Sequence, residues 1–242
     1  MLYKSRAIVL HSIRYGDTSL IVHLITEKYG RQAFMVKGVK TKKATLRANL
    51  FFPLNLLQIE AYYRPNSSLQ RLKEAIHQPP YNTVHTNPVK SAVALFLAEM
   101  LFRIVPSEHY NPDLFDFIYD SLLMYDALEH NHHNFHLMFL IQLLKYEGFY
   151  PTMNYSDENR VFSLHAARFL PPSLARVGDM DEAVSRKFAQ IMQCNYTTMG
   201  DVPLNSGDRM YLLNKLIEYL QLHLHEFAPI KSLSVLHEVF KF

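Results

Sequence analysis

The sequence predicts an α+β protein of two parts: a small β-barrel at residues 1–78 and an all-α helical domain at residues 79–242. Before residue 78, short apolar segments with a period of two alternate with turn signals, and after Pro88 the period changes to about 3.6. Charge changes as well. Residues 1–75 hold 13 Lys and Arg against four acids, whereas residues 76–242 hold 12 against 18.

Five segments rich in β-branched and aromatic residues make up the predicted barrel. They cover residues 3–13, 19–26, 31–39, 50–63 and 68–76. YGDT and EKYG supply turns between the first three segments, and Pro53 marks an edge or a bulge in the fourth. The fifth segment could also form a short helix, but the PNSS turn before it and the QPP stop after it favour a strand.

Amphipathic periodicity predicts the first helices. A stripe that begins after Pro88 ends before Pro106, and it contains Val89, Val93, Phe96, Leu97, Met100, Leu101 and Ile104. Asn111 caps the next helix, with Pro112 at its first position. A third helix over residues 134–147 is apolar through its centre, which predicts a buried helix that ends at Gly148.

Residues 149–176 fit neither period, so we expect an irregular insert with a short strand at Val161–Leu164. Helices are expected again over residues 180–192, 206–227 and 233–240. The longest of these has a core stripe of Leu212, Leu213, Leu216, Ile217, Leu220 and Leu224.

Composition restricts the class of protein. The chain is 49% hydrophobic and 13% aromatic, which is enough to fill a core and excludes disorder. No apolar run reaches the ~18 residues of a membrane span, and the N-terminus lacks the features of a signal peptide. Cys194 is the only cysteine, so neither an internal disulfide nor a cysteine metal cage can form. We therefore expect a cytoplasmic protein without a metal or other cofactor.

Positive charge is concentrated between Lys28 and Ile59, where seven basic residues occur without an acid. These are Lys28, Arg31, Lys37, Lys40, Lys42, Lys43 and Arg47, with Tyr29 and Phe34 interleaved. Cations that neutralise phosphates release counterions, and exposed rings stack on unpaired bases. Together with Lys4, Arg6 and Arg14 they form the predicted nucleic-acid site. The alternative is a solvated loop that keeps the protein soluble.

The sequence indicates neither a metal site nor an enzyme. HNHHNFH at residues 130–136 has histidines at helical spacing, but it lies at a helix junction and no further ligand is placed nearby, so we expect an exposed polar turn. His223 and His225 are two apart and cannot share a helix face. GxSxG, HExxH and Walker A motifs are missing from the sequence, and Cys194 has the setting of a packing residue. Asp17 belongs to a turn.

Residues 3–40 resemble the N-terminus of the RecO family of bacterial recombination mediators. The similarity lies in the strand ending in VLHS, the YGDTS turn, the T-E-x-x-G at Thr26–Gly30, and the K-G of Lys37 and Gly38. The family commonly has Glu at the position of Asp17. AEMLFRIVPSEHYNPDLFDFIYDSL and LLKYEGFYP resemble later segments of the family.

The resemblance implies an OB-fold barrel that binds single-stranded and double-stranded DNA and the partner RecR. It also implies strand annealing and the exchange of single-stranded-DNA-binding protein (SSB) for RecA, without nucleotide hydrolysis and without a membrane. The helical domain would hold the SSB tail, which is acidic and ends in an aromatic residue. A cation beside an apolar groove would suit that tail, and the candidates are Arg103, Lys145, Arg209 and Lys215.

One departure from the family concerns the insert. Many members carry four zinc-binding cysteines there, whereas residues 149–176 contain none. His165 with Asp157 or Glu158 is too poor a set to replace them. We expect a metal-free insert, a degenerate zinc-finger region, held by packing of Phe149, Tyr155, Val161 and Phe162.

Two other functions are compatible with the residues. A protein-binding adaptor would use the basic loop for an acidic partner, and an RNA-binding protein could have a similar barrel.

Overall fold

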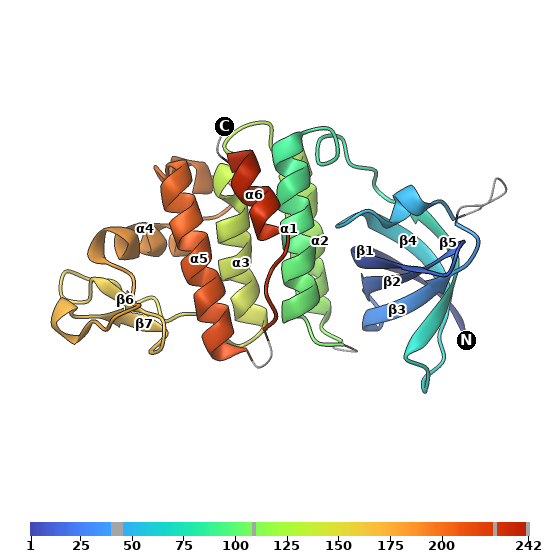
Figure 1. Ribbon diagram of the computed structural model, residues 1–242, viewed down its shortest axis with the longest axis horizontal. Helices are drawn as coiled ribbons and strands as arrows, with labels where there is room; N and C mark the ends of the chain where they lie inside the picture. Colours follow the sequence, from blue (N-terminus) through green and yellow to red (C-terminus); the bar gives the residue numbers. More distant parts are fainter. Residues whose placement is uncertain (40–45, 108–109, 225–226, 241–242) are drawn as a thin grey trace. The chain divides into compact units, whose positions relative to one another are not determined.

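The structure is a computed structural model that describes residues 1–39, 46–107, 110–224 and 227–240 (Figure 1). The chain divides into two compact units. The first comprises Met1–Ala127 and Ile230–Val239, and the second comprises Leu128–Pro229 and Phe240–Phe242. Lys40, Lys42, Lys43 and His225 lie outside the described residues. The division of the chain after residue 78 stays a prediction.

The predicted barrel is confirmed, and it closes in the strand order β1-β2-β3-β5-β4. Its strands are β1 (Leu2–Tyr15), β2 (Ser19–Thr26), β3 (Gly30–Val36), β4 (Leu56–Tyr62) and β5 (Leu69–His77). The long β1 pairs with both β2 and β4, and the parallel pair β3–β5 completes the closure. Residues 69–77 form a strand and not a helix, as the flanking turn signals favoured.

Side chains alternate between the two faces of each strand, and those on the inner face fill the interior of the barrel. Val9, Val22 and Phe34 are fully buried there.

The position of Pro53 differs from the prediction, because it lies in a turn before β4 and not in a strand. Residues Ala48–Phe51 form a short 3-10 helix, η1. Proline cannot donate to a strand ladder, so β4 begins only at Leu56.

Two helices follow the barrel in the first unit, and a third comes from the C-terminal segment. They are α1 (Pro88–Ile104), α2 (Pro112–Ala127) and α6 (Leu233–Phe240). Asn87 caps α1, and the side chain of Asn111 accepts the Leu114 N–H at the start of α2, as predicted for Asn111. The predicted stripe of α1 is buried except for the half-buried Val89. α1 packs against β1 of the barrel.

The second unit contains α3 (Phe135–Tyr146), α4 (Glu182–Gln193) and α5 (Ser206–His223). The centre of α3 is buried and Gly148 follows it with a φ of 78°, both as predicted. Five of the six predicted stripe residues of α5 are buried, whereas Leu224 is half-buried. Within the described part of the chain, every helix is too short or too polar to cross a bilayer.

The insert contains a two-stranded hairpin of β6 (Val161–Ser163) and β7 (Arg168–Leu170). The first strand was predicted, but β7 was missed because three residues are too short to show alternation. Phe162 is fully buried and its ring contacts those of Phe169 and Phe188 at centroid distances of 5.1 and 4.7 Å. Tyr155 packs edge-on against Phe169. Packed rings therefore form the core of the insert, as expected for Tyr155 and Phe162.

Candidate nucleic-acid interface

One end of the barrel gathers exposed cations from β1 and from the connection that follows β3. Arg14 of β1 pairs with Leu20 of β2, which pairs with Val36 of β3, and Lys37 follows directly. The Val39 N–H donates to the Thr18 carbonyl at 2.9 Å, which holds the exit of β3 against the β1–β2 turn. We call this end, with exposed Arg14, Lys37 and Arg47, the loop end.

We call the segment of residues 40–45 the basic loop, and a core residue of the barrel flanks it on each side. Val39 and Leu46 belong to the barrel core and are 6% and 7% exposed. The six residues between them include Lys40, Lys42 and Lys43, which lie outside the described residues. Their attachment points, Lys37–Val39 and Leu46–Arg47, are nevertheless fixed at the same end of the barrel as Arg14. The loop end therefore joins three described cations to three more in sequence.

The remaining predicted cations do not share this end. Lys28 lies in the β2–β3 turn, at the opposite end of β3 from Lys37, and Lys4 lies near the start of β1. A strand of seven residues separates the two ends by roughly 20 Å. We call this second end the turn end. The cations predicted as one cluster are thus divided between two ends.

Two predicted phosphate ligands are engaged inside the protein. Arg6 forms ion pairs with Glu27 at 3.0 Å and with Asp116 of α2 at 2.7 Å. Hydrogen bonds from Arg6 lower the pKa of the Glu27 carboxyl. Arg31 donates to the Phe102 carbonyl and to the Ser107 hydroxyl, and its guanidinium lies 4.9 Å from the Phe102 ring. Both side chains fasten the barrel to the segment that follows it, and their role as phosphate ligands stays a prediction.

The two predicted stacking rings also differ from each other. Phe34 points into the barrel and is fully buried, so the prediction that it stacks on a base is wrong. Its position in the alternation of β3 explains this, because Phe34 and Val36 face inward together. Tyr29 is half-buried and stacks on Tyr63 at a centroid distance of 4.1 Å, with Tyr3 edge-on against it at 4.7 Å.

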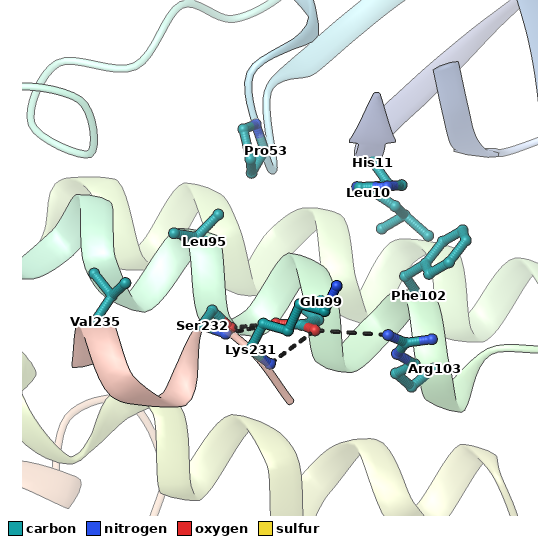
Figure 2. A pocket seen from close by; sticks show the side chains of 10 residues that line it. All are labelled: Leu10, His11, Pro53, Leu95, Glu99, Phe102, Arg103, Lys231, Ser232 and Val235. Atoms are coloured by element: carbon teal, nitrogen blue, oxygen red, sulfur yellow. Dashed lines mark hydrogen bonds and ion pairs between the residues drawn. The ribbon is translucent and has the colours of Figure 1, made fainter. Parts of the chain in front are cut away.

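A cavity of about 370 Å³ lies beside α1, and Arg103 lines it together with apolar side chains (Figure 2). Its apolar lining is Leu10, Pro53, Leu95, Phe102 and Val235. We call it the α1 pocket. Glu99 accepts hydrogen bonds from the Lys231 and Ser232 N–H groups at 3.0 and 2.8 Å, and Arg103 lies 3.7 Å from the same carboxylate. The side chains of Arg103, Lys231 and Glu99 together leave one positive charge in excess.

The other candidate cations of the helical part lie elsewhere. Lys145 is exposed over the Tyr150 ring, and Arg209 donates to the Leu204 carbonyl at 2.6 Å. Lys215 is occupied by Glu218 and by the Gly178 carbonyl. Of the four candidates, Arg103 lines the α1 pocket. Sequence reasoning missed Lys231, because nothing near it in the sequence signals that its segment returns to α1.

The histidine tract is not the exposed turn that we expected. His132 and His136 are buried, and burial lowers the pKa of His136 to about 3. Its ring packs 5.2 Å from that of Phe240. The side chain of Asn134 donates to the Met199 and Val202 carbonyls. Across the residues that the structure describes, no group of His, Cys, Asp and Glu is arranged to hold a metal ion.

Comparisons with known proteins agree with this architecture along the chain. The family described as "Recombination protein O N terminal" matches residues 1–79, and "Recombination protein O C terminal" matches residues 85–234. A "DNA repair protein RecO" of Bacteroides fragilis is 41% identical over 243 residues, covering 99% of this chain and all of the relative. Relatives of the same name from Phocaeicola vulgatus and Porphyromonas gingivalis are 35% and 30% identical, with the same coverage.

Proposed function

The chain belongs to the RecO family of DNA repair proteins, and from this premise we propose that it binds and anneals single-stranded DNA through the loop end of its barrel. We further propose that it works without a catalytic step of its own, in the cytoplasm. It helps a recombinase of the RecA type to replace SSB and also contacts RecR. The observation that carries the proposal is that exposed Arg14, Lys37 and Arg47 share one end of a closed barrel, where the lysine-rich segment of residues 40–45 also begins and ends.

The physical argument is the neutralisation of phosphate charge. Arg14, Lys37 and Arg47 are exposed at the loop end, and Lys40, Lys42 and Lys43 lie between the last two in sequence. Cations that neutralise the phosphates of two strands lower the repulsion between them, so that complementary bases can meet. Binding of this kind weakens steeply with salt, with a slope of about −0.7 per neutralised phosphate on single strands.

The first prediction concerns this salt dependence. Replacing Lys40, Lys42 and Lys43 together with alanine should make the slope of log affinity against log salt less negative by about 2. The measurement is the retention of a labelled single-stranded 30-mer on a filter over a range of salt. The matched control removes three exposed arginines of the second unit, Arg168, Arg176 and Arg186, and should leave the slope unchanged.

The same assay separates the alternatives. An unchanged slope in the lysine variant would remove the loop from the binding site. Absence of any salt-sensitive retention by the wild-type chain would favour a protein-binding adaptor. Preferential competition by single-stranded RNA would favour an RNA-binding protein.

For the SSB tail we propose the α1 pocket. An acidic peptide that ends in an aromatic residue needs a cation beside an apolar surface, and this pocket offers Arg103 and Lys231 next to Phe102 and Leu95. The Glu99 carboxylate is already satisfied by three hydrogen bonds from Lys231 and Ser232, so it holds the pocket together.

The second prediction is a loss of tail binding. The double variant Arg103→Ala and Lys231→Ala should weaken binding of a labelled SSB-tail peptide roughly tenfold or more, because it removes both cations and leaves Glu99 in place. Fluorescence anisotropy of the peptide measures the affinity. Lys145→Ala, an exposed lysine outside the pocket, is the control. Equal affinities for the double variant and the wild type would move the tail site elsewhere.

A further inference from the structure

The turn end of the barrel carries a second cavity, of about 340 Å³. Its lining includes Lys28, Tyr29, Gln32, Tyr63, Gln70 and Tyr110. We call it the tyrosine pocket. Its volume lies at the lower end of the range of small-ligand sites. Neither the annealing argument nor the α1 pocket makes use of it.

The strand register brings the walls of the tyrosine pocket together. The Tyr63 N–H donates to the Met1 carbonyl at 2.8 Å, which fixes the end of β4 beside the start of β1. On the other side of β1, the Glu27 N–H donates to the Arg6 carbonyl, and the Tyr29 N–H donates to the Thr26 hydroxyl. The rings of Tyr29 and Tyr63 therefore meet across the start of β1, with an interplanar angle of 6°.

A buried amide fixes the third wall. The Gln70 side chain is 3% exposed, accepts the Arg64 N–H at 2.8 Å and donates to the carbonyls of Arg64 and Ser67. These bonds hold the β4–β5 turn in one conformation. The Gln32 side chain in turn donates to the Tyr29 carbonyl at 3.1 Å. The pocket is thus built by hydrogen bonds, whereas Tyr110 at its rim is 59% exposed.

The charges around the tyrosine pocket favour an anion. Lys28 and Arg64 are both exposed. Two nearby acids already have cationic partners: Glu27 shares Arg6 with Asp116, and Glu60 is paired with Lys73 at 3.0 Å. A ligand with a flat ring and an attached negative charge would satisfy both the tyrosines and the cations.

We propose that the tyrosine pocket binds an unpaired nucleobase of the DNA strand, with the adjoining phosphate near Lys28. This inference rests on the proposed function, and it adds a site that contacts bases to one that contacts the backbone. Aromatic stacking is tolerant of sequence, because every base has a flat face. The two contacts lie at opposite ends of β3, so a bound strand extends along the barrel. A proline-rich peptide also suits aromatic grooves, but it lacks the negative charge that Lys28 and Arg64 favour.

The test compares two 30-mers of equal charge, one carrying bases and one abasic over its central ten nucleotides, with the full chain. The base-bearing strand should bind roughly tenfold more tightly. Tyr110→Leu and Tyr63→Leu should narrow this difference several-fold and leave the salt slope unchanged, because neither removes a cation. Tyr62→Leu is the control, since Tyr62 is the last residue of β4 and adjoins Tyr63 in the chain but does not line the pocket.

A direct readout is photo-cross-linking of a 5-iodouracil 30-mer followed by peptide mapping. Cross-links to Tyr29, Tyr63 or Tyr110 support the inference. Cross-links confined to other residues, or equal affinity for both 30-mers, overturn the tyrosine pocket and leave the proposed function standing. If the wild-type chain binds neither 30-mer, both the inference and the proposed function fail.

Discussion

Asp126→Ala is expected to lower the free energy of unfolding by about 3–5 kcal/mol, because it breaks a buried network of charges and hydrogen bonds. The Asp126 carboxylate accepts the N–H groups of Asn82 and Thr83, each at 2.8 Å, and that of Val84 at 3.0 Å. These residues belong to the connection between the barrel and α1. Without the carboxylate, three N–H groups lose their acceptor, and that of Val84 is buried.

A buried lysine increases the loss of stability that we expect for Asp126→Ala. Lys90 is 1% exposed, and its ammonium donates to the Thr83 hydroxyl at 2.7 Å and to the Tyr125 carbonyl at 2.8 Å. Thr83 in turn donates to Asp126, so a single hydroxyl links the two charges. Removing the carboxylate takes a negative charge away from the surroundings of the buried Lys90 ammonium.

The pH dependence of this effect follows from the pKa of Asp126. Burial alone would raise that pKa, but the hydrogen bonds from Asn82, Thr83 and Val84 lower it below its ordinary value. The carboxylate therefore contributes stability above pH ~4, and the contribution disappears as pH falls through the lower pKa of the folded state.

Urea unfolding at pH 7 and at progressively lower pH measures both the effect and its pH dependence. Asp120→Ala, an exposed acid on the same helix, should change stability by no more than about 0.5 kcal/mol. A similar small change for Asp126→Ala would show that the connection is held by other contacts.

Phe162→Ala is expected to destabilise the second unit by about 3–5 kcal/mol. The ring of Phe162 is fully buried, and its centroid lies 5.1 Å from that of Phe169 and 4.7 Å from that of Phe188. Removal of the ring therefore leaves a cavity in the centre of the insert. The backbone of Phe162 is also held in position, because its N–H donates a hydrogen bond to the Ser185 hydroxyl at 2.8 Å. That bond survives the substitution and limits collapse of the site.

Thermal unfolding followed by circular dichroism tests this prediction. Leu174→Ala in the same insert removes a side chain that is 59% exposed and serves as the control. Addition of EDTA should leave the melting curve of the wild type unchanged, because packing replaces the metal in this account. A melting temperature that falls with EDTA would contradict that explanation.

Periodicity and turn chemistry predicted most of the fold. The period of two gave the barrel strands, and Asn111, Pro112 and Gly148 marked helix ends because capping depends on neighbouring residues. Burial that depends on distant residues could not be predicted in this way. Residues from other segments bury Lys90 and His136, so the neighbouring sequence contains no pattern that predicts their burial.

The candidate site shows the same limit. The sequence correctly identifies an excess of cations in the first 75 residues, because charge is a property of composition. It does not reveal that Arg6 has a partner on α2, that Arg31 has partners on α1 and just after it, or that Lys28 and Lys37 lie at opposite ends of β3. Register and tertiary contacts decide which cations remain for a ligand.

Annealing of complementary strands coated with SSB is the measurement that tests the central claim most directly. The variant that lacks Lys40, Lys42 and Lys43 should anneal far more slowly than the wild type, while the variant that lacks Arg168, Arg176 and Arg186 should anneal at the rate of the wild type. Equal annealing rates for all three proteins would contradict the claim that cations at the loop end bring the strands together.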